Sequence, residues 1–308
     1  MEFTKRKYAG EDDYWQIRIF LRECFLLNGR REDCWQPAIL DYWRWHINRN
    51  CFEREIDDQI WLWENREKRI SAVLHSAGKR DAILDIHPQY KCWELEQEML
   101  ETALDKLSEK LENGSRKIYV WSQRKDALRN QLLTDFGFER QAIQSRQRYF
   151  PLIDKIAESK LPADYKIRAV GGIEELPARS WASWTAFHPD EPDEKYEGWE
   201  WYLNVQKAPL YRRDLDLVVE APDGTIAGFA TVWLDDHTRT AVFEPVGVDI
   251  NHQRRGIGKA LLLEGLRRSA EMGATLATVI SDEEPAHTFY ESAGFTDYDI
   301  CDAWLKIW

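Results

Sequence analysis

The hydrophobic pattern is clearest in the last third of the chain, where an apolar strand leads directly into an amphipathic helix. Residues 241–250 are rich in valine and isoleucine, a composition that favours a strand. From Ala260 to Ala270, apolar side chains recur at helical spacing and so share one face. A second apolar strand is expected over 275–281, before a further helix. This alternation of strands and helices predicts an α/β fold.

The junction between this strand and its helix is built from small and basic residues. It contains Gln253, Arg254, Arg255, Gly256, Ile257 and Gly258, and it continues through Lys259 and Ala260. The two glycines allow backbone N–H groups to approach a ligand closely. The first N–H groups of a helix have no partner within it, and together with the helix dipole they favour an anion such as phosphate. The junction therefore predicts an anion site.

Two familiar phosphate-binding loops do not fit these residues. A Walker A loop requires a glycine where this chain has Gln253, and a serine or threonine where it has Ala260. The dinucleotide-binding fingerprint requires a third glycine, and Leu261 occupies its position. The sequence therefore predicts neither kind of nucleotide site.

The junction does fit a loop of the form Arg/Gln-x-x-Gly-x-Gly/Ala. Residues 225–295 thereby resemble the GNAT superfamily of acetyl-CoA-dependent acyltransferases, in which the loop amides hold the pyrophosphate of coenzyme A. The resemblance implies a mostly antiparallel mixed sheet flanked by helices, with acetyl-CoA as co-substrate and no metal. It assigns coenzyme binding to Val246, Val248, Gln253, Arg254, Arg255, Gly256, Ile257, Gly258, Lys259 and Ala260.

A second family element follows in the expected order. Tyr290, Gly294 and Phe295 match the GNAT segment that ends in Tyr-x-x-x-Gly-Phe. The family places this tyrosine near the thioester sulfur, where it can protonate the leaving thiolate, so Tyr290 is the predicted general acid. A half-buried helix aromatic is the alternative. The family often has asparagine seven residues before the tyrosine, where this chain has Glu283.

Acyl transfer to an amine also requires a group that removes a proton from the nucleophile. Glu244 is the candidate because it alternates with Val242 and Val246 and so shares their strand face. The usual family glutamate aligns better with Val242, which leaves Glu244 open to three roles: base, anchor for the acceptor amine, or edge carboxylate. The family polarises the thioester oxygen with backbone N–H groups of this strand, a stretch that Val246 and Val248 match. Pro245 lacks an N–H, which agrees with a strand that parts from its neighbour.

Repeated patterns indicate a tandem duplication in this chain of 308 residues. Two segments recur further along the chain: residues 83–89 resemble 247–253, and residues 133–138 resemble 290–295. The predicted organisation is a first GNAT-like copy at 1–150, a connector at 151–163 and a second, catalytic copy at 164–308.

The two copies differ where chemistry would occur. In the first copy, Cys92 and Glu94 stand opposite Gly256 and Gly258, and Leu133 stands opposite Tyr290. Added bulk and negative charge in the loop oppose phosphate binding. The first copy is therefore predicted to be non-catalytic, either closing one side of the acceptor cleft or stabilising the second copy.

Charge is divided unequally between the copies. Residues 1–163 hold 28 basic and 28 acidic side chains, whereas residues 164–308 hold 14 and 26. An acidic cleft concentrates cations, which suits an amine acceptor and does not suit nucleic acid, although surface charge also serves solubility. Aromatic side chains before the second sheet form either an acceptor wall or ordinary core. They are Trp181, Trp184, Phe187, Trp199, Trp201 and Tyr202.

The cysteine pattern and the hydropathy of the sequence restrict the cellular compartment that we expect for the protein. The five cysteines include no Cys-x-x-Cys pair, so neither a disulfide framework nor a zinc site is predicted. The sequence shows neither a signal peptide nor an apolar run of the length that spans a bilayer. We therefore expect a cytoplasmic protein without a membrane partner, as a monomer or homodimer.

Three functions fit these patterns. The first is an acetyl-CoA-dependent N-acetyltransferase that modifies the amine of a small acceptor, which is either neutral or cationic. The second is transfer of another acyl group, or transfer to a hydroxyl, on the same scaffold. The third is a protein that binds or senses coenzyme A without turnover.

Overall fold

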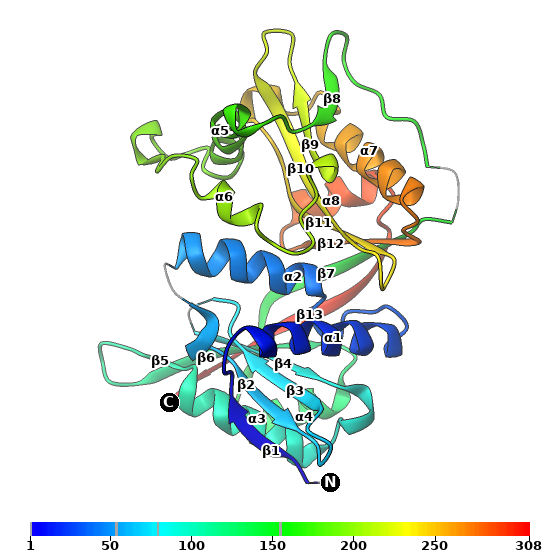
Figure 1. Cartoon of the computed structure of the whole chain (residues 1–308). Coiled ribbons are helices and arrows are strands. Elements are labelled where there is room, and N and C mark those ends of the chain that lie inside the picture. Colours follow the sequence, from blue (N-terminus) through cyan, green and yellow to red (C-terminus); the bar gives the residue numbers. More distant parts are fainter. Residues whose placement is uncertain (1, 53–54, 79, 154–155) are drawn as a thin grey trace.

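The computed structural model describes residues 2–52, 55–78, 80–153 and 156–308, and the strands of these ranges form one continuous mixed sheet (Figure 1). The first seven strands are β1 (Thr4–Lys7), β2 (Trp61–Glu64), β3 (Ile70–His75), β4 (Asp81–Ile86), β5 (Glu109–Lys110), β6 (Arg116–Gln123) and β7 (Glu139–Pro151). The others are β8 (Lys166–Ala169), β9 (Asp216–Glu220), β10 (Ile226–Asp235), β11 (Thr240–Val248), β12 (Leu276–Ser281) and β13 (Asp297–Ile307).

The α-helices fall into two sets of four. The N-terminal set is α1 (Glu11–Leu27), α2 (Pro37–Tyr42), α3 (Trp93–Lys106) and α4 (Ala127–Asp135), and α2 continues into a π-helix, η1 (Trp43–Cys51). The C-terminal set is α5 (Leu176–Phe187), α6 (Tyr202–Val205), α7 (Ile257–Glu271) and α8 (Glu284–Ser292). Single 3₁₀ turns are η2 (Ile56–Asp58), η3 (Pro88–Tyr90), η4 (Ile173–Glu175), η5 (Asp193–Lys195), η6 (Arg213–Leu215) and η7 (Ile250–His252).

Helices cover both faces of the C-terminal part of the sheet because successive strand residues point to opposite sides. On one face, Leu262 and Leu266 of α7 pack in a cluster with Phe243 of β11. On the other face, Val242 packs in a cluster with Tyr202 of α6 and with Ala38 of α2, a helix of the N-terminal half. In Figure 1, α2 accordingly lies between the two halves of the molecule.

The two halves repeat the same order of elements, as the sequence predicted. Strand order is β1-β2-β3-β4-β6 in one half and β8-β9-β10-β11-β12 in the other. The helix after the fourth strand of each half is preceded by Cys92 in one copy and by Gly256 in the other. Gly137 and Gly294 both have positive φ just past the ends of α4 and α8. The fold prediction of two tandem copies with mixed, mostly antiparallel pairing is confirmed.

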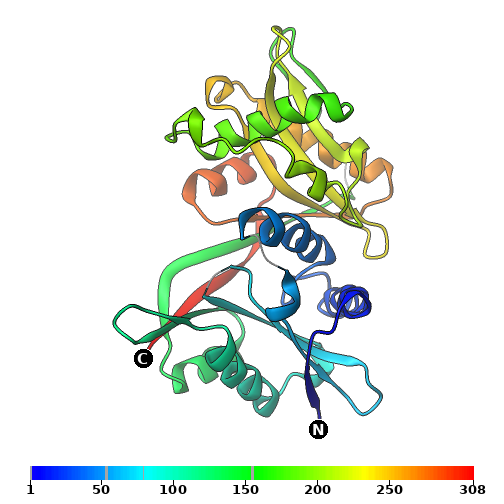
Figure 2. The same ribbon diagram turned by 60° about the vertical axis from the view of Figure 1, so that its left-hand side comes forward.

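The copies exchange their final strands, which the sequence did not predict. β13 pairs antiparallel with β6 of the first copy, and β7 pairs antiparallel with β12 of the second. β7 and β13 also pair with each other at the centre of the sheet, where Figure 2 shows them running together between the two halves. Each half therefore completes its sheet with a strand that belongs in sequence to the other half.

The predicted connector lies beside this exchange. β7 extends through Pro151, which pairs with Leu276 of β12, so the strand enters the first position of the 151–163 connector. Residues 154–155 of that connector lie outside the described residues. The division into domains at 1–150 and 164–308 stays a prediction.

Candidate active site

A split between two parallel strands forms the centre of the candidate site. β11 and β12 pair only from Thr240 to Val242, whereas β11 remains paired with β10 as far as Val248. Among the described residues, no strand therefore lies beside the β12 edge of β11 beyond Val242. The ladder between β10 and β11 also shifts register between Ala230 and Val232, opposite the stretch that contains Pro245.

The backbone of β11 turns two amides toward this open edge. The N–H of Asp249 donates to the carbonyl of Ala227 at 3.0 Å, which defines a hydrogen-bonded pair of the antiparallel ladder. Such pairs recur at every second residue, so Gly247 also faces β10. Val246 and Val248 consequently face the split. Their predicted role in holding and polarising the thioester stays a prediction, and their position suits it.

The glycine-rich junction forms the start of α7 at one end of the split. Gly256 has φ of 82° and occupies the N-cap of α7, and Arg254 precedes it with φ of 61°. No side chain caps α7, and its first turn contains no acidic residue. Arg254 and Lys259 are exposed and form no ion pair with the described residues. The junction therefore presents backbone donors and unpaired positive charge, a combination that suits an anion.

The remaining junction residues hold this shape. A Cβ at Gly258 would lie 2.9 Å from the ring of Phe289 and 3.3 Å from Val248, so glycine permits the close approach of α7, α8 and β11. Ile257 and Ala260 are buried, whereas Gln253 and Arg255 lie on the surface. Gln253 donates to the carbonyl of Val248 at 3.3 Å. These contacts tie the loop to the end of the strand.

Arg255 is held by two residues outside its own turn. Its guanidinium donates to the Tyr165 hydroxyl at 3.0 Å and to the Asn251 carbonyl at 3.3 Å. Both contacts are neutral, so the positive charge of Arg255 remains available to an anion at the loop.

Tyr290 lies on α8, the helix that follows β12. Its ring is buried in the cluster that contains Phe243 and Phe295. Its hydroxyl makes no hydrogen bond to the described residues, and burial raises its pKa well above the ordinary value, with smaller contributions from Glu244 and Asp282. Tyr290 is therefore a protonated hydroxyl near neutral pH and has the chemistry of a proton donor.

Glu244 lies on β11 just past the last residue that pairs with β12. Burial raises the pKa of its carboxyl to about 7, and the negative charge of Asp282 contributes in the same direction. The carboxyl accepts no hydrogen bond from the described residues, whereas the backbone carbonyl of Glu244 accepts one from the Trp233 indole. A carboxyl that titrates near pH 7 has the proton affinity expected of a general base.

A large cavity of about 890 Å³ opens next to Pro245. Four of the six predicted aromatic residues line it: Trp184, Phe187, Trp201 and Tyr202. The floor is buried and includes Thr231 and Val205, and the exposed rim includes Glu194 and Glu197. The cavity has enough volume for a small molecule, and Pro245 is the residue of β11 that lines it.

The N-terminal half supplies one wall of this cavity, which sequence reasoning did not locate. Tyr42, His46, Arg49, Asn50 and Cys51 all line it. The sequence feature that could have indicated this wall is the four-residue spacing of Tyr42, His46 and Asn50, which places polar aromatic and amide groups on one helical face. The prediction that the first copy closes the acceptor cleft fits this arrangement.

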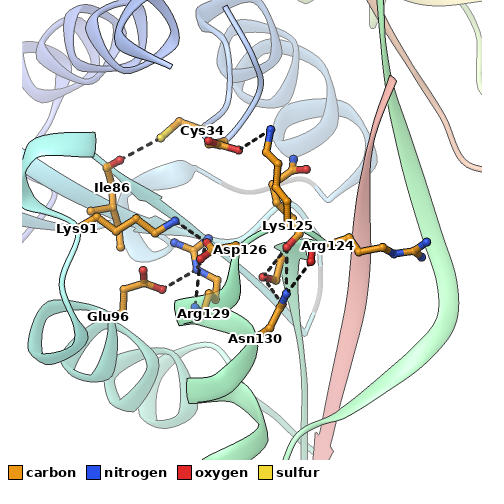
Figure 3. Close-up of polar contacts among 12 residues, drawn as sticks. Cys34, Ile86, Lys91, Glu96, Arg124, Lys125, Asp126, Arg129 and Asn130 are labelled. Atoms are coloured by element: carbon orange, nitrogen blue, oxygen red, sulfur yellow. Dashed lines mark hydrogen bonds and ion pairs between the residues drawn. The ribbon is translucent and has the colours of Figure 1, made fainter. Parts of the chain in front are cut away.

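The corresponding split in the N-terminal copy is filled. β4 and β6 pair in parallel only at Asp81 and Ala82 and then diverge, as β11 and β12 do. Between α3 and α4, Arg129 donates to buried Glu96 at 2.8 Å, and Lys91 pairs with Asp126 (Figure 3). Glu96 and Arg129 occupy the helical positions of Ala260 and Ala286 in the other copy.

A segment of the chain also closes the end of that split. Residues 32–36 bridge the ends of β4 and β6: the Cys34 thiol donates to the Ile86 carbonyl at 3.4 Å (Figure 3), and the Gln123 amide donates to the Glu32 carbonyl at 2.7 Å. The N–H of Trp35 donates to Asp85 at 3.0 Å. Side chains and backbone of the protein therefore occupy the N-terminal split, whereas the C-terminal copy has only alanine at the two positions of the ion pair.

Two further properties bear on the kinds of ligand. Across the part of the chain that the structure describes, no three metal-ligating side chains gather closely enough to hold an ion. Over the same residues, each helix is too short or too polar to cross a membrane.

Comparison with known proteins finds one family model that matches within the C-terminal half. Residues 173–295 match the model of the "Acetyltransferase (GNAT) family". Mycothiol acetyltransferase from Thermobispora bispora is 24% identical to this chain over 252 residues, which cover 78% of this chain and 80% of the relative.

Solved structures share the fold of the whole chain. A GCN5-related N-acetyltransferase from Sphaerobacter thermophilus aligns with a TM-score of 0.68 at 15% identity, over 99% of this chain and 95% of its own. A tandem GNAT protein from the clavulanic acid biosynthesis pathway aligns with a TM-score of 0.66 at 13% identity, over 99% of this chain and 98% of its own.

Proposed function

We propose that the protein transfers an acetyl group from acetyl-CoA to the amine of a small cationic acceptor, because residues 173–295 match the model of the GNAT family of acetyltransferases. The observation that carries the proposal is the strand split itself. It has a helix start with unpartnered backbone donors at one end, Tyr290 and Glu244 beside it, and a cavity that opens next to Pro245.

The residues around the split fit acetyl-CoA. The first-turn amides of α7, with Arg254, Arg255 and Lys259, would hold the pyrophosphate. The outward amides of Val246 and Val248 would hold the thioester end of the molecule. Ala260 and Ala286 leave open the space that a buried ion pair takes in the other copy.

The proposed chemistry requires one proton acceptor and one proton donor. The amine nitrogen attacks the thioester carbon, so that a C–N bond forms and the C–S bond breaks. Glu244 takes the proton that the attacking nitrogen loses, and Tyr290 gives a proton to the departing thiolate. Water then returns a proton to Tyr290 and removes one from Glu244, which leaves an amide and a free thiol.

The cavity supports a cationic acceptor. Aromatic faces attract cations, and four carboxylates in the lining outnumber two cations there. The carboxylates belong to Glu191, Glu194, Glu197 and Glu200, and the cations to Arg49 and Lys195. Lys195 is already paired with Glu191 at 2.9 Å, so the remaining charge of the rim is mainly negative.

The N-terminal copy is proposed to be non-catalytic because its own split is filled. The C-terminal copy would contain one complete active site in each chain, and this arrangement is compatible with a monomer or a homodimer.

The proposal is tested by thiol release from acetyl-CoA in the presence of a panel of amines, with the wild type, Tyr290→Phe and Glu244→Gln. We expect Tyr290→Phe to lower kcat by about 100-fold with little change in the KM for acetyl-CoA, since it removes only the proton donor. Tyr298→Phe, which changes an exposed tyrosine on β13, is the matched control and should leave kcat unchanged.

The pH profile separates the roles of the two groups. A base must be ionised to act, so wild-type kcat/KM should rise as pH increases through about 7, where the Glu244 carboxyl loses its proton. In Glu244→Gln this rise should disappear. Persistence of the same rise in Glu244→Gln would remove Glu244 from the mechanism, and coenzyme A binding without release from any amine would count against the enzyme assignment.

A further inference from the structure

The continuous helix formed by α2 and the π-helix η1 presents one polar face to the acceptor cavity. Tyr42, His46 and Asn50 recur every four residues and all line the cavity. The opposite face is buried and includes Trp43 and Asn48. π-helical turns are rare and often occur at functional sites. This face is the part of the non-catalytic copy that a molecule in the cavity would meet.

His46 is held in place by aromatic neighbours from both copies. Its ring centroid lies 5.0 Å from that of Tyr42 and 4.8 Å from that of Trp201, which belongs to the C-terminal half. These contacts fix the plane of the imidazole at the boundary between the copies.

A chain of amides determines which ring nitrogen of His46 carries the proton. The side-chain nitrogen of Asn50 lies 3.2 Å from the Trp201 carbonyl, which can only accept, so this atom is a donor. At the other end of the chain, the ammonium of Lys207 can only donate, and it donates to the side-chain oxygen of Asn204 at 3.2 Å. The Asn204 nitrogen then donates to the Asn50 oxygen at 2.8 Å. The side-chain orientations of Asn50 and Asn204 are therefore both determined, because the Trp201 carbonyl can only accept a hydrogen bond and the Lys207 ammonium can only donate one.

The same Asn50 nitrogen lies 3.0 Å from Nδ1 of His46. Because Asn50 is the donor, Nδ1 must be the acceptor, and the ring proton resides on Nε2. Burial lowers the pKa of His46 to about 4, and the positive charge of Arg179 contributes, so the ring stays neutral near pH 7. Nε2 makes no hydrogen bond to the described residues. The protein does not fully enclose this atom.

We propose that His46 is the acceptor-recognition residue of the enzyme, and that its Nε2–H donates to a carbonyl or hydroxyl oxygen carried by the acceptor amine. The acceptor class is then an amine with a nearby hydrogen-bond-accepting oxygen, such as an amino-acid amide, an amino alcohol or an amino sugar. This inference rests on the proposed acetyltransferase function. It gives the non-catalytic copy a direct part in substrate selection, with Asn50 as the positioning residue that fixes the tautomer.

The test compares matched amines that differ mainly in the oxygen. Suitable pairs are ethanolamine with propylamine, glycinamide with isobutylamine, and glucosamine with cyclohexylamine, each assayed by thiol release from acetyl-CoA. We expect the wild type to favour the oxygen-bearing member of a pair. His46→Phe, which retains an aromatic ring between Tyr42 and Trp201, should reduce that preference by about tenfold, the factor that one hydrogen bond supplies. The change should appear in the KM for the amine.

Two more variants complete the test: the first restores a hydrogen-bond donor at position 46, and the second moves the ring proton of His46. His46→Gln restores an N–H donor and should recover part of the preference. Asn50→Asp places a carboxylate beside Nδ1, which attracts the ring proton to Nδ1 and also raises the pKa of the imidazole. In assays well above pH 7, where the ring is neutral, Nε2 is then an acceptor, so the preference for an oxygen acceptor should fall as in His46→Phe. The KM for acetyl-CoA reports whether each variant keeps an intact fold and coenzyme site.

The possible outcomes are distinct. Absence of transfer to every amine in the panel, with acetyl-CoA bound, would contradict the proposed function itself. Transfer that is equal within each pair, or a His46→Phe variant that lowers both members equally, would overturn the role of His46 while leaving the acetyltransferase function in place.

Discussion

The two strand splits of this molecule have the same geometry and opposite contents. In the C-terminal copy the space between the starts of α7 and α8 is bordered by Ala260 and Ala286, whereas Glu96 and Arg129 form an ion pair in the corresponding space of the N-terminal copy. Residues 32–36 then close the N-terminal split. The proposed ligand site thus has small residues and unpartnered donors, whereas the copy proposed to be non-catalytic has protein groups that satisfy one another.

The filled split of the N-terminal copy also finds its polar partners within the protein. A split between strands leaves backbone and helix-end groups unpaired, and such groups are costly when they are buried. The N-terminal copy meets this requirement internally: Asp126 caps α4 by accepting from the N–H of Arg129, and it also pairs with Lys91. In the C-terminal copy, Glu283 provides no such cap for α8.

The largest expected effect comes from breaking the internal pair of the filled copy. Arg129→Met leaves the buried Glu96 carboxylate without its partner and should lower the free energy of unfolding by about 3–5 kcal/mol. Urea denaturation measures this change. The double variant Glu96→Leu/Arg129→Met removes both charges and should regain most of the loss.

Neither variant should alter the affinity for acetyl-CoA, because the pair lies in the copy that is proposed not to bind it. A change in that affinity comparable to the change in stability would show that the two splits are not independent, and the comparison between them would fail.

A smaller effect, on coenzyme binding itself, is expected when the C-terminal copy receives the glutamate that the N-terminal copy has at the corresponding position. Gly258→Glu introduces the side chain that Glu94 has in the first copy, with a Cβ only 2.9 Å from Phe289 and a negative charge beside the proposed pyrophosphate site. We expect the affinity for coenzyme A to fall by at least about 100-fold, close to 3 kcal/mol, as measured by calorimetric titration.

The reciprocal change is the matched control. Glu94→Gly introduces a glycine at an exposed position of α3 and should cost about 1 kcal/mol of stability without affecting coenzyme A binding. Normal coenzyme binding by a folded Gly258→Glu variant would remove the α7 start from the proposed site.

The smallest effect concerns Glu32, at the start of the segment that closes the N-terminal split. Burial raises the pKa of its carboxyl from the ordinary 4.5 to about 7, although hydrogen bonds with Gln36 and Thr278 act in the opposite direction. The folded protein therefore retains a proton that the unfolded chain releases above pH 4.5. The resulting stabilisation is present at low pH and is lost as pH rises through 7.

Between pH 6 and pH 8 this group should lower the free energy of unfolding by about 1 kcal/mol. Glu32→Gln has no proton to lose, so the difference between wild type and variant should change by that amount over this pH range in urea denaturation. An unchanged difference would mean that Glu32 is ionised in the folded protein.

The sequence predicted the features of the open copy that depend on neighbouring residues. The strand before the junction, the helix start at Gly256 and the helix that contains Tyr290 all form close to where the hydrophobic pattern places them. The strand ends at Val248 and not at residue 250, because Ile250 belongs to the 3₁₀ turn η7 that Asp249 caps. Local pattern and turn chemistry are sufficient for such elements.

Features that depend on distant contacts were not predicted. The exchange of β7 and β13 requires pairing between strands that no local periodicity connects. The pair of Glu96 and Arg129 joins two helices, and nothing in either helix indicates that these charges are buried together. His46 is likewise an ordinary helical histidine in the sequence, and its tautomer depends on Trp201 and Lys207 of the other copy.

The exchange of β7 and β13 also means that the first copy cannot complete its sheet until β13 has been synthesised. While the first copy emerges from the ribosome, β6 has an unpaired edge, because its neighbour β13 is the last strand of the sequence. An exposed edge strand readily pairs with another chain, and pairing between strands far apart in sequence forms slowly. Nascent chains that are translated from the same mRNA should therefore be most prone to associate with one another after residue 123 has been synthesised and before residue 307 has been added. A chaperone that covers β6 during this interval should increase the yield of folded protein.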